Sequence, residues 1–415
     1  MENGSEISIL REGAAPLAQM AELWQSTPVP APQIAALSTL RQPRVTRLVL
    51  ANFRSYAQLD ISFGGDTVVL TGENGAGKTN VLEALSLLSP GRGLRRAEFS
   101  DCARKPGDGR FAVSTLVAEG GATTTLGTAL EPQTDGGQSR KFRIDRNPTA
   151  SPRDFADHLR LVWQTPAMDG LFSGPAGERR RFLDRLVLAV DAGHAVRANA
   201  LERALRNRNR LLENGVQAGW LDAAERELAE LAVAVAAARR ETVARLAALL
   251  LARRDEGSAF PWADLALQGD VEGSLDEMSA LEAENRYRAV LRENRGRDAA
   301  AGRTLIGPQA SDLVVRHGPK DIDAKQASTG EQKALLTGLV LGHARLVGGL
   351  TGLAPLILLD EIAAHFDPVR RAALFEETRS LGGQVWMTGA DEAAFATLGR
   401  DATFLRVSQG AIRVE

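Results

Sequence analysis

The sequence predicts an α/β fold, with a head domain built around a sheet and an inserted antiparallel helical arm. Three observations lead to this prediction: a glycine-rich loop between a strand pattern and a helix pattern, an apolar strand pattern that ends in two acids, and a proline-free helical stretch between them. Strand, loop and helix in succession, followed by a further buried strand, are typical of α/β sheets. We expect the head to comprise residues 45–165 and 305–415, and the arm residues 166–304.

Residues 1–44 differ in composition from the rest of the chain. They contain five prolines, with the run Ser26-Thr-Pro-Val-Pro-Ala-Pro32. Proline has no backbone N–H and a fixed φ, so such a run is typical of extended or disordered segments. We therefore predict a disordered N-terminal extension, whose simplest role is that of a dispensable tail.

Composition excludes several classes of protein. The chain has 415 residues, a formal net charge of −2 and one cysteine, Cys102. The balanced charge excludes a uniformly basic nucleic-acid coat, although a local basic face is compatible with it. A single cysteine cannot form an internal disulfide, which fits a reducing compartment, and we expect a cytoplasmic protein. We see neither a secretory signal nor an apolar stretch of about 18 residues, so no membrane association is expected.

A phosphate-binding loop is predicted at Gly72–Thr79, which matches the pattern G-x-x-x-x-G-K-[ST] in full. A strand pattern precedes it and an apolar helical run follows it. Glycines let backbone N–H groups turn inward around phosphate oxygens. Lys78 is then placed to reach the β- and γ-phosphates of ATP, and the Thr79 hydroxyl to bind Mg²⁺. The predicted ATP-binding residues here are Gly72, Glu73, Asn74, Gly75, Ala76, Gly77, Lys78, Thr79 and Asn80.

The arm is predicted to consist of two long helices, Glu178–Glu213 and Leu221–Arg254, because residues 176–260 contain no proline. Turn residues from Asn214 to Gly219 separate the two. A weak heptad in the second helix favours an antiparallel pair over a long coiled coil. At about 1.5 Å per residue, each helix spans roughly 50 Å.

A further helix is predicted to begin at Ser328-Thr-Gly-Glu-Gln332. A serine and a glycine at a helix N-terminus favour an anion, although Ser328 and Glu331 also fit a plain capping box. The segment resembles the signature motif of the ATP-binding-cassette superfamily. The resemblance implies that Ser328, Gly330 and Gln332 close over ATP bound by a second subunit, so that two subunits enclose two nucleotides.

The apolar strand Leu356–Leu359 is predicted to end at Asp360 and Glu361. Ligands bind at the carboxyl ends of strands in open α/β sheets. We therefore expect Asp360 to hold Mg²⁺ through water and Glu361 to polarise the attacking water. Two ordinary strand-end acids are the alternative interpretation. With Lys78, these two acids form the predicted catalytic set.

The superfamily resemblance extends to the segment Ala363–Asp367, to Thr388 and to Gln164, and Arg54 is a further candidate from its place in the sequence. Ala363–Asp367 corresponds to the loop after the acidic strand, and Thr388 stands where many members carry a switch histidine. Gln164 follows a strand pattern and corresponds to the Mg²⁺-sensing glutamine. Arg54 lies beside the phosphate-loop strand in the sequence pattern, and we expect it to contact the nucleotide.

Other segments resemble the RecF family of bacterial recombinational repair. They are Leu48–Tyr56, Gly91–Arg96, Gly174–Asp184 and Ala204–Leu212. The resemblance implies an ATP-dependent homodimer that binds duplex DNA beside a single-stranded gap and acts with RecR and RecO to load RecA. It also implies slow, DNA-linked ATP hydrolysis that serves repair, replication restart and the SOS response at the nucleoid.

One family motif is altered in this chain. The family usually carries G-P-H-R-x-D-L before the signature segment, whereas this chain has Gln309 and Ala310 in place of the histidine and arginine. The resemblance therefore leaves the role of these two positions, at DNA or between subunits, unassigned.

The sequence has three groups of arginines that could pair with DNA phosphates; one is Arg92, Arg95 and Arg96, and the other two supply the residues expected to bind DNA. Arg203, Arg206 and Arg210 fall on one side of the predicted arm helix, roughly opposite its apolar stripe. Arg179 and Arg180 form a second cluster. Arginines at such positions pair with backbone phosphates without reading the base sequence. The alternative is an ordinary solvated face balanced by nearby acids.

Two other functions are compatible with the sequence. The chain could be the ATPase subunit of a membrane transporter, although the long helical pair and the threonine at position 388 oppose this. It could also be another repair or defence ATPase. Chromosome-structuring relatives need much longer arms, however, and zinc-hook relatives need a pair of cysteines that this chain lacks.

Overall fold

The computed structural model describes residues 39–132, 137–215, 217–363 and 366–415. Most of the predicted N-terminal extension, residues 1–38, lies outside this part of the chain. Its last residues already belong to the head, because Leu40 is buried and Arg41 forms a bridge with Leu353. The folded head therefore begins before residue 45.

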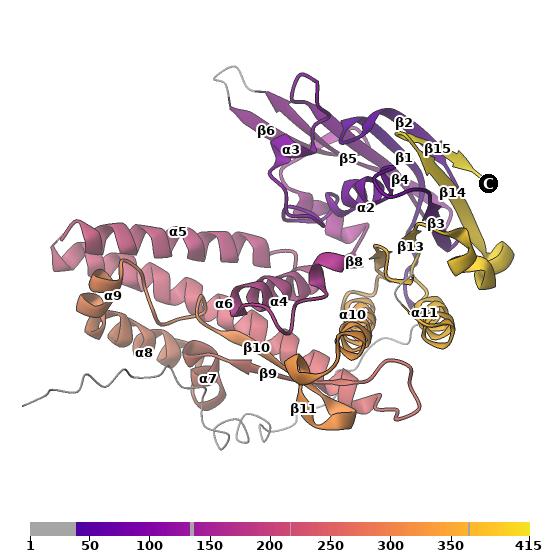
Figure 1. Ribbon diagram of the computed structural model, residues 1–415. Coiled ribbons are helices and arrows are strands. Elements are labelled where there is room, and N and C mark those ends of the chain that lie inside the picture. The colour runs from indigo at the N-terminus through magenta and orange to yellow at the C-terminus, as the bar shows by residue number, and fades with distance from the viewer. Residues whose placement is uncertain (1–38, 133–136, 216, 364–365) are drawn as a thin grey trace, which may run out of the picture.

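Two six-stranded sheets make up the head within the described residues (Figure 1). The first sheet is antiparallel, in the order β2 (Tyr56–Ser62), β1 (Arg44–Phe53), β4 (Phe111–Glu119), β5 (Ala122–Pro132), β6 (Gln138–Ile144) and β7 (Asn147–Thr149). The second runs in the order β15 (Ala411–Val414), β14 (Ala402–Ser408), β3 (Thr67–Thr71), β13 (Val385–Gly389), β12 (Leu356–Leu359) and β8 (Leu161–Gln164). Its pairs are parallel except β14 with β15. Strands from both ends of the chain thus share one sheet.

The central strands of the second sheet are apolar on both faces. Successive side chains of a strand point to opposite faces, so Leu356 and Leu358 pack towards the antiparallel sheet, whereas Ile357 and Leu359 pack towards the helices on the other side. Such unbroken apolar runs are typical of a parallel sheet that is covered on both faces. The covered sheet is a rigid platform, and its strand ends carry the candidate site.

Helices cover the sheet and build the arm. Those in the head are α2 (Lys78–Ser86), α3 (Phe99–Cys102), α10 (Thr329–Thr351) and α11 (Pro368–Ser380). Those in the arm are α4 (Ala176–Val190), α5 (His194–Glu213), α6 (Ala218–Ala252), α7 (Asp270–Glu277), α8 (Ala280–Glu293) and α9 (Arg295–Ala301). A small sheet of β9 (Ala263–Gln268), β10 (Asp312–His317) and β11 (Ile322–Asp323) lies between the two parts (Figure 1).

The prediction of one helix over Glu178–Glu213 is wrong. The segment forms α4 and α5, which are separated at Asp191-Ala-Gly193. The Asp191 side chain accepts a hydrogen bond from the Gly193 amide at 2.8 Å, and this local bond competes with helix continuation. α5 and α6 then pack along each other as the predicted antiparallel pair (Figure 1).

Helix α10 is long and apolar enough, by length and composition, to cross a membrane, contrary to the expectation that no such stretch exists. About two thirds of its most apolar window is buried inside the protein (67%). Its buried residues join the core between the second sheet, α4 and α6. The apolar composition of α10 is therefore accounted for by its position in the core.

His343 on α10 gives the protein a predictable pH dependence. Its Nε2–H donates to the Leu186 carbonyl of α4 at 2.9 Å, and burial lowers its pKa from 6.5 to about 4. Between these values the unfolded chain binds the proton and the native one does not, so stability falls as pH falls from 6.5 towards 4. We expect His343→Gln, which retains an N–H donor, to reduce the loss of unfolding free energy between pH 7 and pH 5 by about 2 kcal/mol.

The measurement is urea unfolding at the two pH values. His158→Gln is the matched control for replacing a histidine by glutamine, because His158 is partly exposed and lies outside the contact between α10 and α4. Equal pH dependence in wild type and His343→Gln would show that His343 is not the group responsible.

Candidate nucleotide site

The predicted phosphate loop joins β3 to α2. Gly72 and Gly77 have φ values of 140° and 118°, which favour glycine. A Cβ at Gly72 would lie 2.3 Å from the Val407 carbonyl oxygen. The Lys78 ammonium donates to the carbonyls of Gly72 and Glu73 at 2.7 and 2.9 Å. Burial lowers the pKa of Lys78, and the charges of Glu361 and Asp360 oppose this shift. The cation is therefore held inside the loop, and its contact with the phosphates of ATP stays a prediction.

Thr79 and Asp360 meet at the end of this loop although they are far apart in sequence. The Thr79 hydroxyl donates to Asp360 Oδ1 at 2.9 Å, and the Thr388 hydroxyl donates to the same oxygen at 2.8 Å. Burial raises the pKa of Asp360, and the two hydroxyl bonds oppose the rise. A hydroxyl and a carboxylate are hard oxygen donors of the kind that Mg²⁺ prefers. The residues present thus fit the predicted metal.

A cluster of protein ligands does not by itself define this site. Among the described residues, no group of three or more His, Cys, Asp or Glu is placed to hold a metal ion. Mg²⁺ is usually held by one or two carboxylates together with substrate phosphates and waters. The set Thr79, Asp360 and Gln164 is consistent with that mode of binding.

Thr388 links the two acids at the end of β12. Its hydroxyl donates to Asp360 and accepts a hydrogen bond from the Glu361 amide at 2.8 Å. Glu361 has a φ of 56°, a left-handed conformation that is uncommon for a non-glycine residue and often found at functional sites. The position that many cassette proteins give to histidine is therefore occupied here by a threonine whose hydroxyl bonds the carboxylate of Asp360 and the backbone amide of Glu361.

Gln164 ends β8 beside β12, as predicted. Its carbonyl accepts a hydrogen bond from the Asp360 amide at 3.0 Å. Its side chain is buried, and its Oε1 accepts a hydrogen bond from the Thr337 hydroxyl of α10 at 3.1 Å. Gln164 and Asp360 thus stand at the carboxyl ends of neighbouring parallel strands.

Arg54 lies beside the first turns of α2, but its guanidinium is already bonded. Two of its nitrogens donate to the carboxylate of Glu83 at 2.8 and 2.6 Å, and a third donates to the Asp101 carbonyl at 2.7 Å. Glu83 is fully buried and also pairs with Arg95 at 2.9 Å. This arrangement indicates that Arg54 anchors α2, and a direct contact with nucleotide stays a prediction.

The N-terminus of α10 has the predicted capping box. The Glu331 amide and the Ser328 hydroxyl oxygen are 3.4 Å apart, and the Ser328 amide donates to the Glu331 carboxylate at 3.0 Å. The ion pair with Lys320 and the Ser328 bonds lower the pKa of Glu331 to about 2. Ser328 and Gly330 are both exposed. This helix end is therefore accessible to a second chain.

Gln332 does not share that exposure. Its amide nitrogen donates to the carbonyls of Lys325 and Ala327 at 3.3 and 2.8 Å, and its oxygen accepts from Ser173 at 3.1 Å. The expectation that Gln332 faces the nucleotide of a second subunit is wrong for this conformation. The side chain instead fixes the turn that leads into Ser328.

The two arginine clusters differ in the structure. Arg203, Arg206 and Arg210 are exposed on α5, and their spacing of three and four residues places them on one face. Arg206 lies 3.6 Å from Glu202, and such an exposed ion pair is weak.

Arg179 and Arg180 are partly buried, and both bond other parts of the chain. Arg179 forms a bidentate ion pair with Asp312 at 2.8 and 2.7 Å, and Arg180 donates to the Ser311 carbonyl at 2.8 Å. Both side chains hold α4 to the segment that leads into β10. The prediction that Arg179 binds DNA is therefore wrong, because its donors are used within the chain, whereas DNA binding by Arg180 stays a prediction.

Sequence reasoning missed a buried polar network at the centre of the arm. Arg208 is fully buried and bonds Glu225, Asp298 and Thr304 at 3.1, 2.7 and 2.8 Å. The neighbouring Asn209 accepts from the Thr304 amide at 2.9 Å. The sequence did single out this place, since Arg208 and Asn209 lie within Ala204–Leu212, one of the segments that resemble the RecF family. The residues to which they bond, however, are far away in sequence.

Gln309, one of the two altered motif positions, also has a structural role. Its amide nitrogen donates to the carbonyls of Thr304 and Ile306 at 3.2 and 2.9 Å. The side chain thus closes the turn between α9 and β10, next to the network around Arg208.

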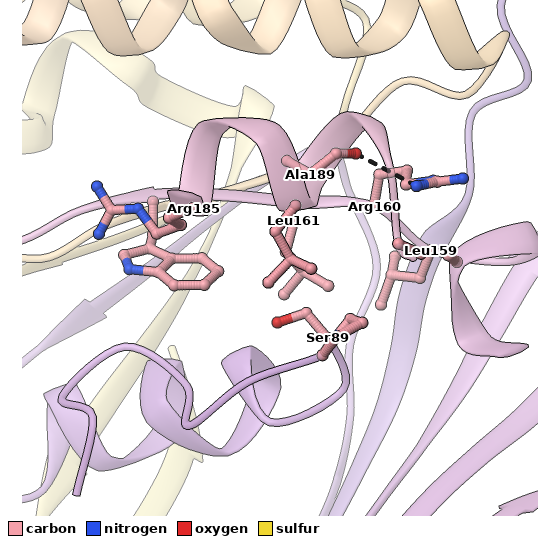
Figure 2. Close-up of a pocket in the computed structure, with 11 residues that line it drawn as sticks. Ser89, Leu159, Arg160, Leu161, Arg185 and Ala189 are labelled. Carbon is pink, nitrogen blue, oxygen red and sulfur yellow. Dashed lines mark hydrogen bonds between the residues drawn. The ribbon is translucent and has the colours of Figure 1, made fainter. Parts of the chain in front are cut away.

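A small cavity lies beside β8, away from the phosphate loop (Figure 2). It has a volume of about 20 Å³, which suffices for one or two waters and is far smaller than a nucleotide requires. Arg160 donates across it to the Ala189 and Val190 carbonyls of α4, both at 3.3 Å. This cavity therefore belongs to the joint between β8 and α4.

Comparison with known proteins identifies the family. A family model described as the RecF/RecN/SMC N terminal domain matches residues 44–410. A protein of Rhizobium meliloti named DNA replication and repair protein RecF is 52% identical over 369 residues, which cover 89% of this chain and 98% of that protein. The chain belongs to the RecF family. The RecF protein of Mesorhizobium japonicum is 50% identical over 372 residues, with the same coverage of 89% and 98%.

Two solved RecF structures share the fold. One, described as the recombination mediator protein RecF-ATPrS in the RecFOR pathway, gives a TM-score of 0.78 at 19% identity and covers 91% of this chain and 99% of its own. The second, described as RecF-ATP, gives 0.76 at 20% identity and covers 90% and 100%. The predicted fold class, an ATP-binding-cassette head with an inserted helical arm, is therefore confirmed for this RecF-family chain.

Proposed function

We propose that this protein is an ATP-gated DNA clamp of the RecF type, which dimerises on ATP·Mg²⁺ and holds DNA at a junction between duplex and a single-stranded gap. The observation that supports this most strongly is the meeting of Thr79 and Thr388 at Asp360 through two hydroxyl hydrogen bonds, at the end of the loop that holds Lys78. The relatives are named for DNA replication and repair. An exposed Ser328 and Gly330 supply the surface that a second copy needs.

The chain's own residues divide the work at the nucleotide. Lys78 neutralises phosphate charge from inside the loop, and the loop amides hold phosphate oxygens. Thr79, Asp360 and Gln164 are the residues that would hold Mg²⁺, which supplies positive charge to the phosphate oxygens when it is bound. Glu361 orients and deprotonates the attacking water. Ser328 and Gly330 of the second subunit close over the γ-phosphate, so that hydrolysis loosens the dimer.

The arm is proposed to contact the DNA backbone. Arg203, Arg206 and Arg210 present an exposed basic face on a rigid helix, and arginines of this kind position a duplex without reading its sequence. RecR is the proposed direct partner, with RecO and RecA acting downstream, because two solved relatives are described as mediators of the RecFOR pathway. We propose a cytoplasmic, nucleoid-associated protein with slow, DNA-linked ATP hydrolysis.

The test is the fluorescence anisotropy of a labelled gapped duplex, with and without ATP·Mg²⁺, over a series of salt concentrations. ATP should tighten binding in the wild type and leave Lys78→Ala unchanged, because the variant lacks the cation that holds the phosphates. The logarithm of the affinity should fall with the logarithm of salt by about 0.9 per phosphate contact. Arg203→Gln and Arg210→Gln should each reduce that slope by about 1.

The matched control is Arg286→Gln, an exposed arginine of α8 on the other side of α6 (Figure 1). It should leave the slope unchanged. If ATP has no effect on the DNA affinity of the wild type, the clamp proposal is wrong. The nucleotide site would then serve another function, such as that of the ATPase subunit of a transporter.

A further inference from the structure

Trp220 stands in solvent at the tip of the arm, where α5 ends and α6 begins. It is the third residue of α6, and 68% of its surface is exposed. The other three tryptophans of the described ranges each have a ring contact: Trp163 with Arg185, Trp262 with Arg254, and Trp386 with Phe63. Single exposed apolar side chains are ordinary on protein surfaces, so the surroundings of Trp220 decide what its ring can bind.

Trp220 points away from α8 and α9. Residues two apart in an α-helix lie about 200° apart around its axis, so Trp220 and Asp222 face nearly opposite directions. Asp222 pairs with Arg292 of α8 at 3.1 Å and with Arg295 of α9 at 2.6 Å. The indole of Trp220 is therefore directed to the opposite side of α6.

Arg210, near the end of α5, is turned to the same side of the arm. Arg208, two residues earlier, bonds Asp298 of α9 at 2.7 Å, so the same helical spacing directs Arg210 away from α9. α5 and α6 pack as an antiparallel pair (Figure 1), and packed helices lie about 8–10 Å apart. Arg210 and Trp220 therefore lie on one face of the arm, each within about one turn of its tip.

This face carries positive charge next to the indole. The exposed charged residues of α5 are three arginines, Arg203, Arg206 and Arg210, and two acids, Glu202 and Glu213. The arginines extend over about 10 Å of α5 towards the tip. Cationic side chains that follow a phosphate backbone, together with an aromatic ring on which a base stacks, are typical of proteins that bind single-stranded nucleic acid.

The indole and the arginines differ in the DNA that they can contact. A base inside a duplex is stacked on its neighbours and has to leave the stack before an aromatic side chain can cover its face. Phosphates, in contrast, are present on duplex and single strand alike, so arginines bind both. The tip of the arm thus combines a contact to any DNA with one that requires an unpaired base.

We propose that Trp220 stacks on an unpaired base at the edge of a single-stranded gap, while Arg203, Arg206 and Arg210 hold phosphates of the adjoining duplex. The inference rests on the function proposed above and names the part of the DNA that the tip of the arm recognises. It gives the preference for a junction a physical basis, because a fully paired duplex offers this face phosphates alone.

The test is the fluorescence anisotropy of two labelled DNAs of equal length, a gapped duplex and a fully paired duplex, with the full-length protein and ATP·Mg²⁺. Trp220→Ala should weaken binding of the gapped duplex about 10-fold, a typical effect of removing one base–aromatic stack, and change binding of the paired duplex less than about 2-fold. Trp220→Phe, which keeps a ring, should recover most of the loss. Leu281→Ala is the matched control, because Leu281 is 67% exposed on α8, and it should change neither affinity.

Two further readouts separate stacking from charge. Stacking displaces no counterions, so Trp220→Ala should keep the salt dependence of the wild type, whereas Arg210→Gln should reduce it. The fluorescence of 2-aminopurine at the first unpaired position should be quenched by the wild type and not by Trp220→Ala. The same base placed within the duplex should show no difference between the two proteins.

Two results would overturn this inference and leave the proposed function intact. Equal binding of the gapped duplex by Trp220→Ala and wild type would show that the ring contacts no base and is available to another protein. An equal loss on both DNAs would show that Trp220 does not recognise the single strand. The proposed function itself fails if ATP leaves the wild-type affinity for the gapped duplex unchanged.

Discussion

Glu361→Gln is expected to slow ATP hydrolysis by about 100-fold or more and to trap the closed, DNA-bound dimer. A positioned general base contributes about 10²–10⁴-fold to such a step, and glutamine keeps the shape of the side chain without its basicity. The backbone amide of Glu361, bonded to Thr388, is unaffected by the change. Nucleotide binding and closure should therefore persist while opening fails.

Two measurements check this result. Single-turnover hydrolysis gives the chemical rate, and the release of a labelled gapped duplex after addition of competitor gives the lifetime of the closed state. Glu376→Gln removes the same charge from an exposed position on α11 and should behave like wild type in both. Faster release of DNA by Glu361→Gln than by wild type would refute the role assigned to this acid.

The nucleotide site was predictable because its signals are local or follow from sheet geometry. The loop Gly72–Thr79 depends on glycines and a lysine that stand next to each other in the chain. The meeting of Thr79 with Asp360 follows from a general rule, since the carboxyl ends of parallel strands lie at one edge of the sheet. The rule holds here although these residues are 281 positions apart.

The predictions that failed at Arg179 and Gln332 did so for the same physical reason. Whether an arginine faces solvent or another residue depends on partners that a linear pattern does not reveal. Arg179 pairs with Asp312, which is 133 positions away, whereas Arg210 has the same local appearance and is exposed. Gln332 belongs to the same motif as Ser328 and Gly330, which are both exposed. The side-chain amide of Gln332 is instead buried and donates to the Ala327 carbonyl.

The break between α4 and α5 shows that the absence of proline is not enough to predict where a helix ends. Residues 176–260 lack proline, and this absence favoured one continuous helix over Glu178–Glu213. An aspartate followed two residues later by glycine can also end a helix, because the carboxylate bonds the backbone amide that the helix would otherwise use. The Asp191–Gly193 bond is such a case.

Arg208→Met is expected to be the most destabilising single substitution in the arm. The arginine is fully buried and joins α5 to Glu225 on α6 and to Asp298 on α9. Removing one partner of a buried ion pair costs about 3–5 kcal/mol, because the remaining charge is left without compensation. Glu225 keeps a second partner in Arg295 at 2.5 Å, so Asp298 carries most of this penalty.

Urea unfolding followed by hydrogen exchange of the arm amides measures the effect. Arg210→Met, two residues further along the same helix and exposed, should shift the midpoint little. Adding Asp298→Asn to Arg208→Met should recover part of the loss, since it removes the uncompensated charge. If Arg208→Met and Arg210→Met unfold alike, the network does not stabilise the arm.

The network lies between α5 and α9 and not at the nucleotide. Arg208→Met should therefore also weaken DNA binding, because it loosens the helix α5 that carries Arg203, Arg206 and Arg210, while ATP binding stays unchanged.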